Sequence, residues 1–346
     1  MLTARLFIFT YIINIAFLIY KLYYINKILC LFYKSSYIML LRKLNILNII
    51  TAFFLCFNFV YASINPLFNI NLSDMAVFDI NNKPSTNSET TNRIHEIYIE
   101  QTASGGYNPI KFNAETKLYY RASLYKNRNG FLWDGNKAEF GIENNFSLAS
   151  DMVGVYADIR PLSFFGIRAS ANFIIMYNIL NYGYAGFSTN EGIDYSAEAL
   201  SKMQKYDTFG FMFGVSPYLV FKFANLVFIN NFSINYIFAG DKNYYYEPRT
   251  AILHKRSEIE IMDEAFILAN INPIYLGGYY DLTYLFNSKI MTHKLGVAGI
   301  IYFNFLENRL KLNVLMTAGL HVGLPNYNSR VFVELKASLV YRIMQK

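Results

Sequence analysis

The residues that could carry out chemistry are few in this chain. It has four histidines, His95, His254, His293 and His321, and none has a histidine or carboxylate at the spacing of a metal site. His321 lies just before the loop 323–329 and could form half of a hydrolytic site with a serine, asparagine or aspartate. A lone histidine at a strand end near a membrane interface is the simpler interpretation. We therefore expect no catalytic residue, no metal site, no bound cofactor and no enzymatic activity.

Other kinds of site are also missing from the sequence. It contains neither a glycine-rich phosphate loop nor a dinucleotide-binding fingerprint after a strand. Both cysteines, Cys30 and Cys56, fall within residues 1–62, so residues 63–346 can form no disulfide and no thiolate metal site. Residues 1–62 also hold six basic residues and no acidic one, and they account for most of the formal net charge of +7. The basic balance therefore indicates no nucleic-acid partner.

The remaining charged residues follow a period of two. In residues 331–343, Val, Val, Leu, Ala, Leu, Tyr and Ile occupy every second position, and Glu334, Lys336 and Arg342 fall between them. Successive side chains of a strand face opposite sides, whereas a helix would spread both sets around its axis. The segment is longer than the ~5–6 residues usual in a soluble sheet. It is long enough to supply the ~9–11 residues with which a strand crosses a bilayer.

The same pattern recurs along residues 94–346. We count about twelve such segments, with roughly ten to fourteen as the range, and long and short connections alternate between them. The longest connections are 181–207 and 240–263. The sequence therefore predicts an all-β fold: a single antiparallel up-and-down transmembrane β-barrel, preceded by an N-terminal helical leader. Beyond the leader, no uncharged run of ~20 residues indicates a helical membrane protein.

The distribution of charge predicts which strand face points outward. A membrane barrel directs apolar side chains at lipid and polar ones into the lumen, which is the reverse of a soluble barrel. Strand faces that carry charges alternate here with faces that carry almost none. We therefore predict that the lumen is lined by Lys111, Glu115, Lys117, Arg121, Glu139, Glu143, Asp158, Arg160, Arg168, Lys222, Asp281, Lys294, Lys311, Glu334, Lys336 and Arg342.

The residues before the barrel are predicted to direct export. Residues 39–62 combine a short basic start, an apolar run and a final Val-Tyr-Ala, which together describe a signal peptide cleaved after Ala62. Residues 1–38 form an apolar extension, which is either an additional membrane helix or a stretch upstream of a true translation start at Met39. Residues 63–93 are polar and rich in turn-forming residues, and we expect a flexible segment there.

These features together resemble the transmembrane β-barrel proteins of bacterial outer membranes. The features are the leader ending in Val60-Tyr61-Ala62, the period-two repeats, the Asn and Gly turns and the strand at the end of the chain. The resemblance is to the class and covers most of residues 94–346. It implies an outer-membrane location, contact with outer-membrane lipid and insertion by the barrel-assembly machinery. One departure is the final Ile343-Met344-Gln345-Lys346, where such barrels usually end on an aromatic residue.

The function is expected to reside in the lumen. Ten of the predicted lumen residues are basic and six are acidic, which favours a small porin-like diffusion channel for small polar or anionic solutes. Alternatively, these charges pair and fill the lumen, because about twelve strands lie between the ~8 that leave little space and the ~16 that leave a channel. A structural or adhesive surface barrel acting through 181–207 and 240–263 is the second candidate, and an outer-membrane hydrolase is a distant third. We expect Tyr244–Tyr246 and His254–Arg256 to form a solvated external loop. No pattern indicates an oligomeric state.

Overall fold

The computed structural model describes residues 95–125, 132–133, 135–147, 149–178, 183–189, 192–271, 274–306 and 309–345. The predicted apolar extension, signal peptide and flexible segment, at 1–38, 39–62 and 63–93, lie outside these residues. In the part of the chain that is described, no helix is long and apolar enough to cross a membrane.

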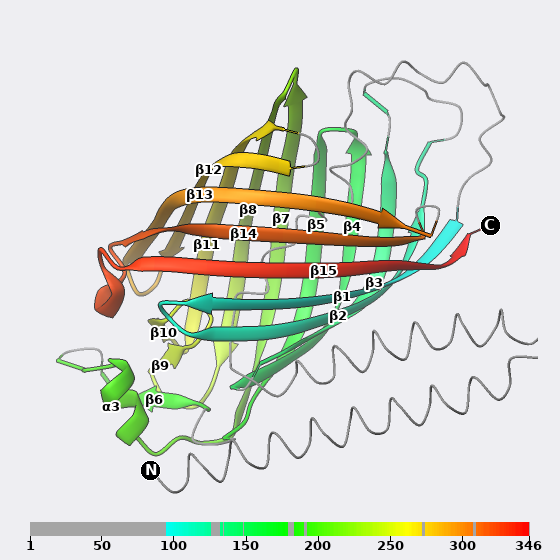
Figure 1. Cartoon of the computed structure of the whole chain (residues 1–346). Helices are drawn as coiled ribbons and strands as arrows, with labels where there is room; N and C mark the ends of the chain where they lie inside the picture. Colours follow the sequence, from blue (N-terminus) through cyan, green and yellow to red (C-terminus); the bar gives the residue numbers. More distant parts are fainter. Residues whose placement is uncertain are drawn as a thin grey trace, which may run out of the picture. The chain divides into compact units, whose positions relative to one another are not determined.

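Twelve antiparallel strands form a closed barrel, as the period-two pattern predicts (Figure 1). Around the barrel their order is β1-β15-β14-β13-β12-β11-β8-β7-β5-β4-β3-β2, so successive barrel strands are neighbours in the sheet. The predicted up-and-down topology is therefore confirmed. The strands are β1 His95–Tyr107, β2 Lys111–Ala122, β3 Lys137–Phe146, β4 Ser150–Leu162, β5 Phe165–Met176, β7 Thr208–Phe223, β8 Leu226–Ala239, β11 Ser257–Asn270, β12 Ile274–Leu285, β13 Ile290–Phe305, β14 Leu310–Val322 and β15 Val331–Gln345.

The barrel closes between its first and its last strand. Ala103 of β1 pairs with Ala337 of β15 on one side and with Ala114 of β2 on the other. Each strand therefore has two hydrogen-bonded neighbours around the ring. Closure leaves no row of unpaired backbone N–H and C=O groups, and only such a sheet is compatible with hydrocarbon.

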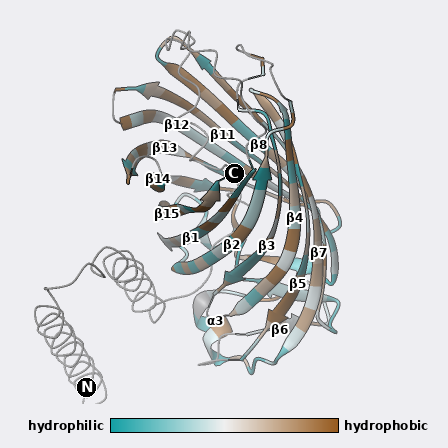
Figure 2. Cartoon of the chain, turned by 90° about the vertical axis from the view of Figure 1, so that its right-hand side faces the viewer, coloured by the Kyte–Doolittle hydropathy of each residue, from teal (hydrophilic) through white to brown (hydrophobic). Residues whose placement is uncertain are grey.

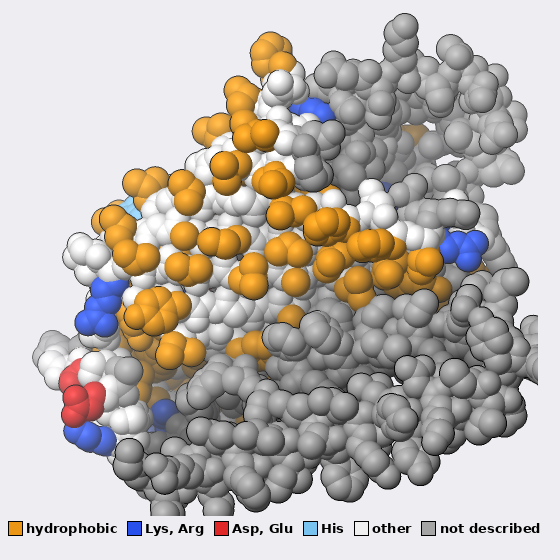
Figure 3. Space-filling model, in the orientation of Figure 1, with side chains coloured by type: hydrophobic (Ala, Val, Ile, Leu, Met, Phe, Trp, Pro, Cys, Tyr) orange, Lys and Arg blue, Asp and Glu red, His pale blue; other side chains and the backbone are white. Residues whose placement is uncertain are grey.

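The outer surface of the barrel is apolar and its inner surface is polar. Exposed fractions reach 57% for Ile142, 53% for Phe213 and 50% for Leu335, whereas Lys117 and Glu334 on the alternate registers are buried. Hydrophobic and hydrophilic residues alternate along the strands in Figure 2, and hydrophobic side chains are spread over the described outer face visible in Figure 3. This is the orientation of a membrane barrel and the reverse of a soluble one.

The two longest connections fold together at one end of the barrel (Figure 1). The first carries β6 Ala185–Phe187 and α3 Ala197–Lys202, and the second carries β9 Tyr244–Glu247 and β10 Ile252–Lys255. The three strands form a small sheet in the order β10-β9-β6. The second connection is shorter than predicted, because β11 begins at Ser257 and Asp263 already lies within it. In β11, Glu258 and Glu260 face inward and alternate with the outward-facing Ile259 and Ile261.

Part of the barrel interior is packed with apolar side chains. One cluster of buried residues comes from seven neighbouring strands, β7, β8 and β11 to β15. Its members are Val220, Val227, Ile229, Phe266, Leu268, Tyr279, Ala298, Ile300, Leu315 and Phe332. These side chains fill part of the lumen against the strands that they belong to.

Candidate functional site in the barrel lumen

The predicted lumen residues all lie on inward-facing registers of the barrel, and none of them is exposed. Five are half-buried: Arg121, Lys294, Lys311, Lys336 and Arg342. The other eleven are buried: Lys111, Glu115, Lys117, Glu139, Glu143, Asp158, Arg160, Arg168, Lys222, Asp281 and Glu334.

Many of these charges are paired along the wall formed by β1 to β5. Lys117 Nζ lies 3.0 Å from Glu115 Oε1. Glu139 Oε1 receives hydrogen bonds from Arg121 Nε at 2.5 Å and Lys137 Nζ at 2.9 Å. The Arg168 guanidinium donates to the Glu143 carboxylate and also stacks over the Tyr156 ring, 3.6 Å from its centroid. Pairing of this kind offsets the desolvation of charges that a narrow lumen imposes.

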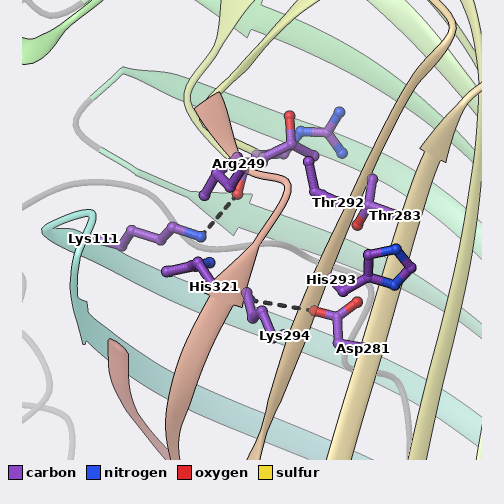
Figure 4. Close-up of a pocket in the computed structure, with 10 residues that line it drawn as sticks. Lys111, Arg249, Asp281, Thr283, Thr292, His293, Lys294 and His321 are labelled. Carbon is purple, nitrogen blue, oxygen red and sulfur yellow. Dashed lines mark hydrogen bonds and ion pairs between the residues drawn. The ribbon is translucent and has the colours of Figure 1, made fainter. Parts of the chain in front are cut away.

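A second charged group lies on β2, β12, β13 and β15, near the end that carries the long loops. Lys294 Nζ is 2.9 Å from Glu334 Oε1 and 3.3 Å from Asp281 Oδ2. Lys111 Nζ lies 3.9 Å from the same Glu334 oxygen. The hydrogen bond of His321 Nε2 is to the carbonyl oxygen of Asn108, at 2.6 Å. A cavity of about 20 Å³ separates these residues, which is room for about one or two water molecules (Figure 4).

The structure adds charged residues that sequence reasoning missed. Lys137 is one further inward-facing cation, and five further acids face inward: Glu96, Glu100, Glu258, Glu260 and Glu264. The described barrel strands therefore direct eleven basic and eleven acidic side chains inward. The excess of positive charge, on which the expected preference for anions rested, does not exist. A period-two reading of β1 and β11 would have found the five acids.

The connection between β8 and β11 enters the mouth of the barrel. We call residues 241–255 the plug. Tyr245, Ile252 and His254 have exposed fractions of 0%, so the prediction that Tyr244–Tyr246 and His254–Arg256 form a solvated external loop is wrong. Space inside a closed barrel is available to a loop at its rim, and apolar residues such as Ile252 and the ring of Tyr245 gain free energy by filling it.

The plug contacts strands on opposite sides of the lumen. Lys111 Nζ of β2 donates a hydrogen bond to the carbonyl oxygen of Arg249 at 3.0 Å. Arg249 Nη1 approaches Met212 Sδ of β7 at 3.5 Å. Tyr245 belongs to a buried apolar cluster with residues of β4, β5, β7 and β8, and Ile252 packs with Leu285 of β12. The plug therefore closes the lumen at this end.

The plug has a polar core of its own. Arg249 Nε donates to Glu247 Oε1 at 2.8 Å, and both side chains are buried. Burial acts to raise the pKa of Glu247, but the Arg249 guanidinium outweighs it and holds that pKa below its ordinary value. Burial lowers the pKa of His254 to about 3. Its imidazole is therefore neutral, and its 3.9 Å approach to Glu260 Oε2 is not an ion pair.

The contact between Thr250 and His254 has the composition of a nucleophile and base but not the geometry. Thr250 Oγ1 lies 2.8 Å from His254 Nε2, and the same nitrogen is the one closest to Glu260. A catalytic triad instead uses the second ring nitrogen to hold the carboxylate. The histidine is also fully buried, so no substrate reaches it in this arrangement.

Acidification is expected to loosen the plug. The pKa of His254 is about 3 in the docked plug and 6.5 ordinarily, so the released plug binds more protons at any pH between these values. The contribution of His254 to the docking free energy is complete above pH 6.5 and declines as the pH falls, by roughly 2–3 kcal/mol at about pH 4.5. Hydrogen–deuterium exchange of the plug amides, corrected for the intrinsic effect of pH, measures this decline.

The control for this prediction is His254→Gln, which keeps a polar group toward Thr250 but does not titrate. We expect this variant to lose most of the acid response. Glu247 and Arg249 in the plug and Glu260 on β11 also face His254. An unchanged acid response in His254→Gln would assign the effect to Glu247 instead, because its pKa is held below the ordinary value in the docked plug.

Three observations now define the architecture: a closed ring of twelve antiparallel strands, an apolar outer surface and a charged interior. The chain is a transmembrane β-barrel. No protein-family model matches it, and a search of curated proteins finds no match. Its solved structural neighbours are outer-membrane β-barrels.

The structural likenesses are broad and distant. The translocator domain of the autotransporter NalP from Neisseria meningitidis has a TM-score of 0.36 at 9% identity, over 78% of this chain and 94% of that one. LpxR from Salmonella typhimurium has a TM-score of 0.35 at 5% identity, over 70% and 99%. An outer-membrane channel from Pseudomonas putida F1 has a TM-score of 0.33 at 8% identity, over 75% and 100%.

Proposed function

We propose that this barrel is a gated diffusion channel of the bacterial outer membrane for small polar solutes, without enzymatic activity. In the conformation described here the channel is closed by the plug. Opening requires the plug to leave the lumen while the strands of the wall stay in place. The observation that carries the proposal is the combination of a charged lumen wall with a closing element that is not part of that wall.

The charges of the wall support a passage that is filled with water in its open state. Replacing buried ion pairs by apolar side chains of similar volume is often neutral or stabilising. The apolar cluster of β7, β8 and β11 to β15 demonstrates that this barrel can fill its interior in that way. The barrel therefore does not need charged residues such as Lys117, Glu115 and Arg168 to fill its interior. These side chains become hydrated when water enters the lumen.

The plug is suited to reversible release. It leaves the wall at Ala239 and returns at Arg256, whose carbonyl oxygen accepts a hydrogen bond from the Ala239 backbone N–H at 3.0 Å. β8 and β11 remain paired below this point, from Phe238 and Ser257 onward. Removing the plug from the lumen therefore breaks contacts of its side chains, and either separates β9 from β6 or moves β6 with it, without opening the β8–β11 ladder.

Planar-bilayer recording of the refolded protein tests the proposal. We expect mostly closed channels at neutral pH, with brief openings that become more frequent on acidification. With equal inward charges of both signs, we expect weak discrimination between small cations and anions. A protein that inserts into lipid but conducts neither at neutral nor at acidic pH, with or without the plug, would falsify the channel function.

The folded loops support a second candidate, a surface barrel that binds an external ligand. The sheet β10-β9-β6 joins the two longest connections through Gly186–Tyr245 pairing, so both are parts of one ordered cap. Ordered loops on a rigid barrel are a usual location for binding residues. Two results together would favour this candidate. The plug-deleted protein would not conduct, and the β10-β9-β6 sheet of the unaltered protein would resist protease digestion.

A further inference from the structure

One hydrogen-bonded pair on the membrane-facing surface contains a carboxylate away from a strand end, whereas the outward pair of Thr116 and Gln101 on β2 and β1 is uncharged. Asn230 of β8 and Asp263 of β11 both face outward, on the registers that alternate with buried Ile229 and Met262. Asn230 Nδ2 donates a hydrogen bond to Asp263 Oδ1 at 2.5 Å. Within the described barrel strands, Asp263 is the one outward-facing carboxylate that lies away from a strand end.

Apolar residues surround Asp263 on all sides. Along β11, Ile261 and Ala265 are the outward residues before and after it. Across the sheet, its register partners are Phe232 of β8 and Leu282 of β12. Lipid headgroups and water therefore do not reach it along the strand, and hydrocarbon offers no hydrogen bonds to a carboxylate. Ionisable groups in this position are expensive and commonly face protein instead of lipid.

We propose that the Asn230–Asp263 pair is the centre of a contact between two copies of this chain in the membrane. The two side chains touch, so their polar tips lie at one height in the bilayer. A two-fold axis along the membrane normal, passing between β8 and β11, places each asparagine opposite the aspartate of the other copy. Two such pairs then form a closed ring of four side chains.

The hydrogen-bonding capacity of the pair matches this arrangement. An ionised carboxylate offers about four acceptor sites, and an asparagine amide has two N–H donors. The nearest second acceptor for Asn230 Nδ2 within the chain is the Glu264 carbonyl oxygen, at a long 3.4 Å. In the proposed contact, the Asn230 amide of one copy donates a hydrogen bond to the Asp263 carboxylate of the other copy. This self-complementarity selects a second copy of the chain over an unrelated membrane protein.

Small side chains beside the pair, at Ala265, and further along the same side of the barrel allow the two barrels to approach. Ala265 and Ala269 of β11 and Gly278 of β12 all face outward. A Cβ atom added to Gly278 would meet no atom within 4 Å, so packing inside this barrel does not require a glycine there. Small residues promote close contact between membrane-spanning elements. Here they support the contact that the polar pair defines.

Disulfide cross-linking tests the proposal. Replacing Cys30 and Cys56 by serine removes both cysteines of the full chain, so a single new cysteine can be introduced at a chosen position. Ala265 is the register partner of Asn230 and lies beside the proposed axis. In lipid vesicles at low protein density, we expect Ala265→Cys to form a disulfide-linked dimer under mild oxidation.

The matched control is Ala337→Cys, which faces outward on β15, four strands around the barrel from β11. We expect this variant to stay monomeric. A monomeric Ala265→Cys, or equal cross-linking of the two variants, would overturn the proposal. Cross-linking of Ala265→Cys in intact cells to a species of a different mass would replace the second copy by another partner.

A second pair of variants separates the contact from barrel stability. The double variant Asn230→Leu with Asp263→Leu makes this part of the outer surface fully apolar, so we expect the barrel to fold. It should keep the difference in electrophoretic mobility between the folded and the heat-denatured protein. Its dimer dissociation constant should rise roughly tenfold, because two reciprocal hydrogen bonds between membrane-spanning segments have about that effect. Asp263→Asn keeps a hydrogen-bonding partner and should stay dimeric. An unchanged dissociation constant in the folded double variant would contradict the proposed role of the pair.

Discussion

Replacing residues 240–255 by Asn-Gly is expected to convert a mostly closed barrel into an open one. Ala239 and Arg256 already lie opposite each other, joined by a backbone hydrogen bond of 3.0 Å. A two-residue Asn-Gly connection fits this geometry because it forms the type I′ turn preferred by tight hairpins. The variant loses Tyr245, Arg249, Ile252 and His254 from the lumen. We expect the mean bilayer conductance to rise by about an order of magnitude or more, as for a pore from which an obstruction is removed.

The fold of the plug-deleted variant is checked independently of its conductance. The β8–β11 ladder from Phe238–Ser257 to Leu226–Ala269 is untouched, so the heat-dependent mobility shift of the barrel should persist. The control is Glu198→Ala, which removes an exposed ion pair with Lys202 on α3 and leaves the plug intact. Its conductance should equal that of the unaltered protein. A folded but silent plug-deleted barrel would mean that the wall side chains alone close the lumen.

The second large effect is expected from a charge on the lipid-facing surface. Leu335 lies within β15 and faces outward, flanked by Val333 and Ala337 on the same face. Leu335→Arg should destabilise the barrel by roughly 2–4 kcal/mol if it lies at the bilayer midplane. Urea unfolding in lipid vesicles, followed by the mobility shift, measures the loss.

The matched variant is Leu335→Met, which keeps an apolar side chain of similar volume and should cost less than about 1.5 kcal/mol. A difference between the two variants reports the environment of one surface position and not a change of packing inside the barrel. If Arg and Met are tolerated equally well, the apolar outer surface of β15 does not face lipid.

The strands were predictable because one local signal decides them. In Val331–Gln345 the alternation of side chains assigns the two faces, and the charges on Glu334, Lys336 and Arg342 decide which face is inside. This signal requires no knowledge of distant residues. It explains why the closed twelve-stranded topology and the inward position of the sixteen predicted residues agree with the structure.

The plug was not predictable from local pattern. Tyr245 and His254 lie in short segments next to charged residues, and such composition is typical of an external loop. Their burial depends on space enclosed by strands far away in the sequence, such as β2 and β7, whose Lys111 and Met212 contact Arg249. The start of β11 was different: Glu258 and Glu260 alternate with Ile259 and Ile261, but the preceding His254-Lys255-Arg256 suggested that the loop continued.

The pairing of β1 with β15 has a consequence for how the barrel assembles. These strands are joined along twelve registered pairs, yet more than two hundred residues separate them in the chain. The seam between them is the contact of longest sequence separation in the sheet, and contacts of this kind form slowly because a large loop must close first. Until that seam forms, β1 and β15 each keep one exposed backbone edge that hydrocarbon cannot satisfy. A chain cut before β15 therefore leaves β1 and β14 with one unpaired backbone edge each.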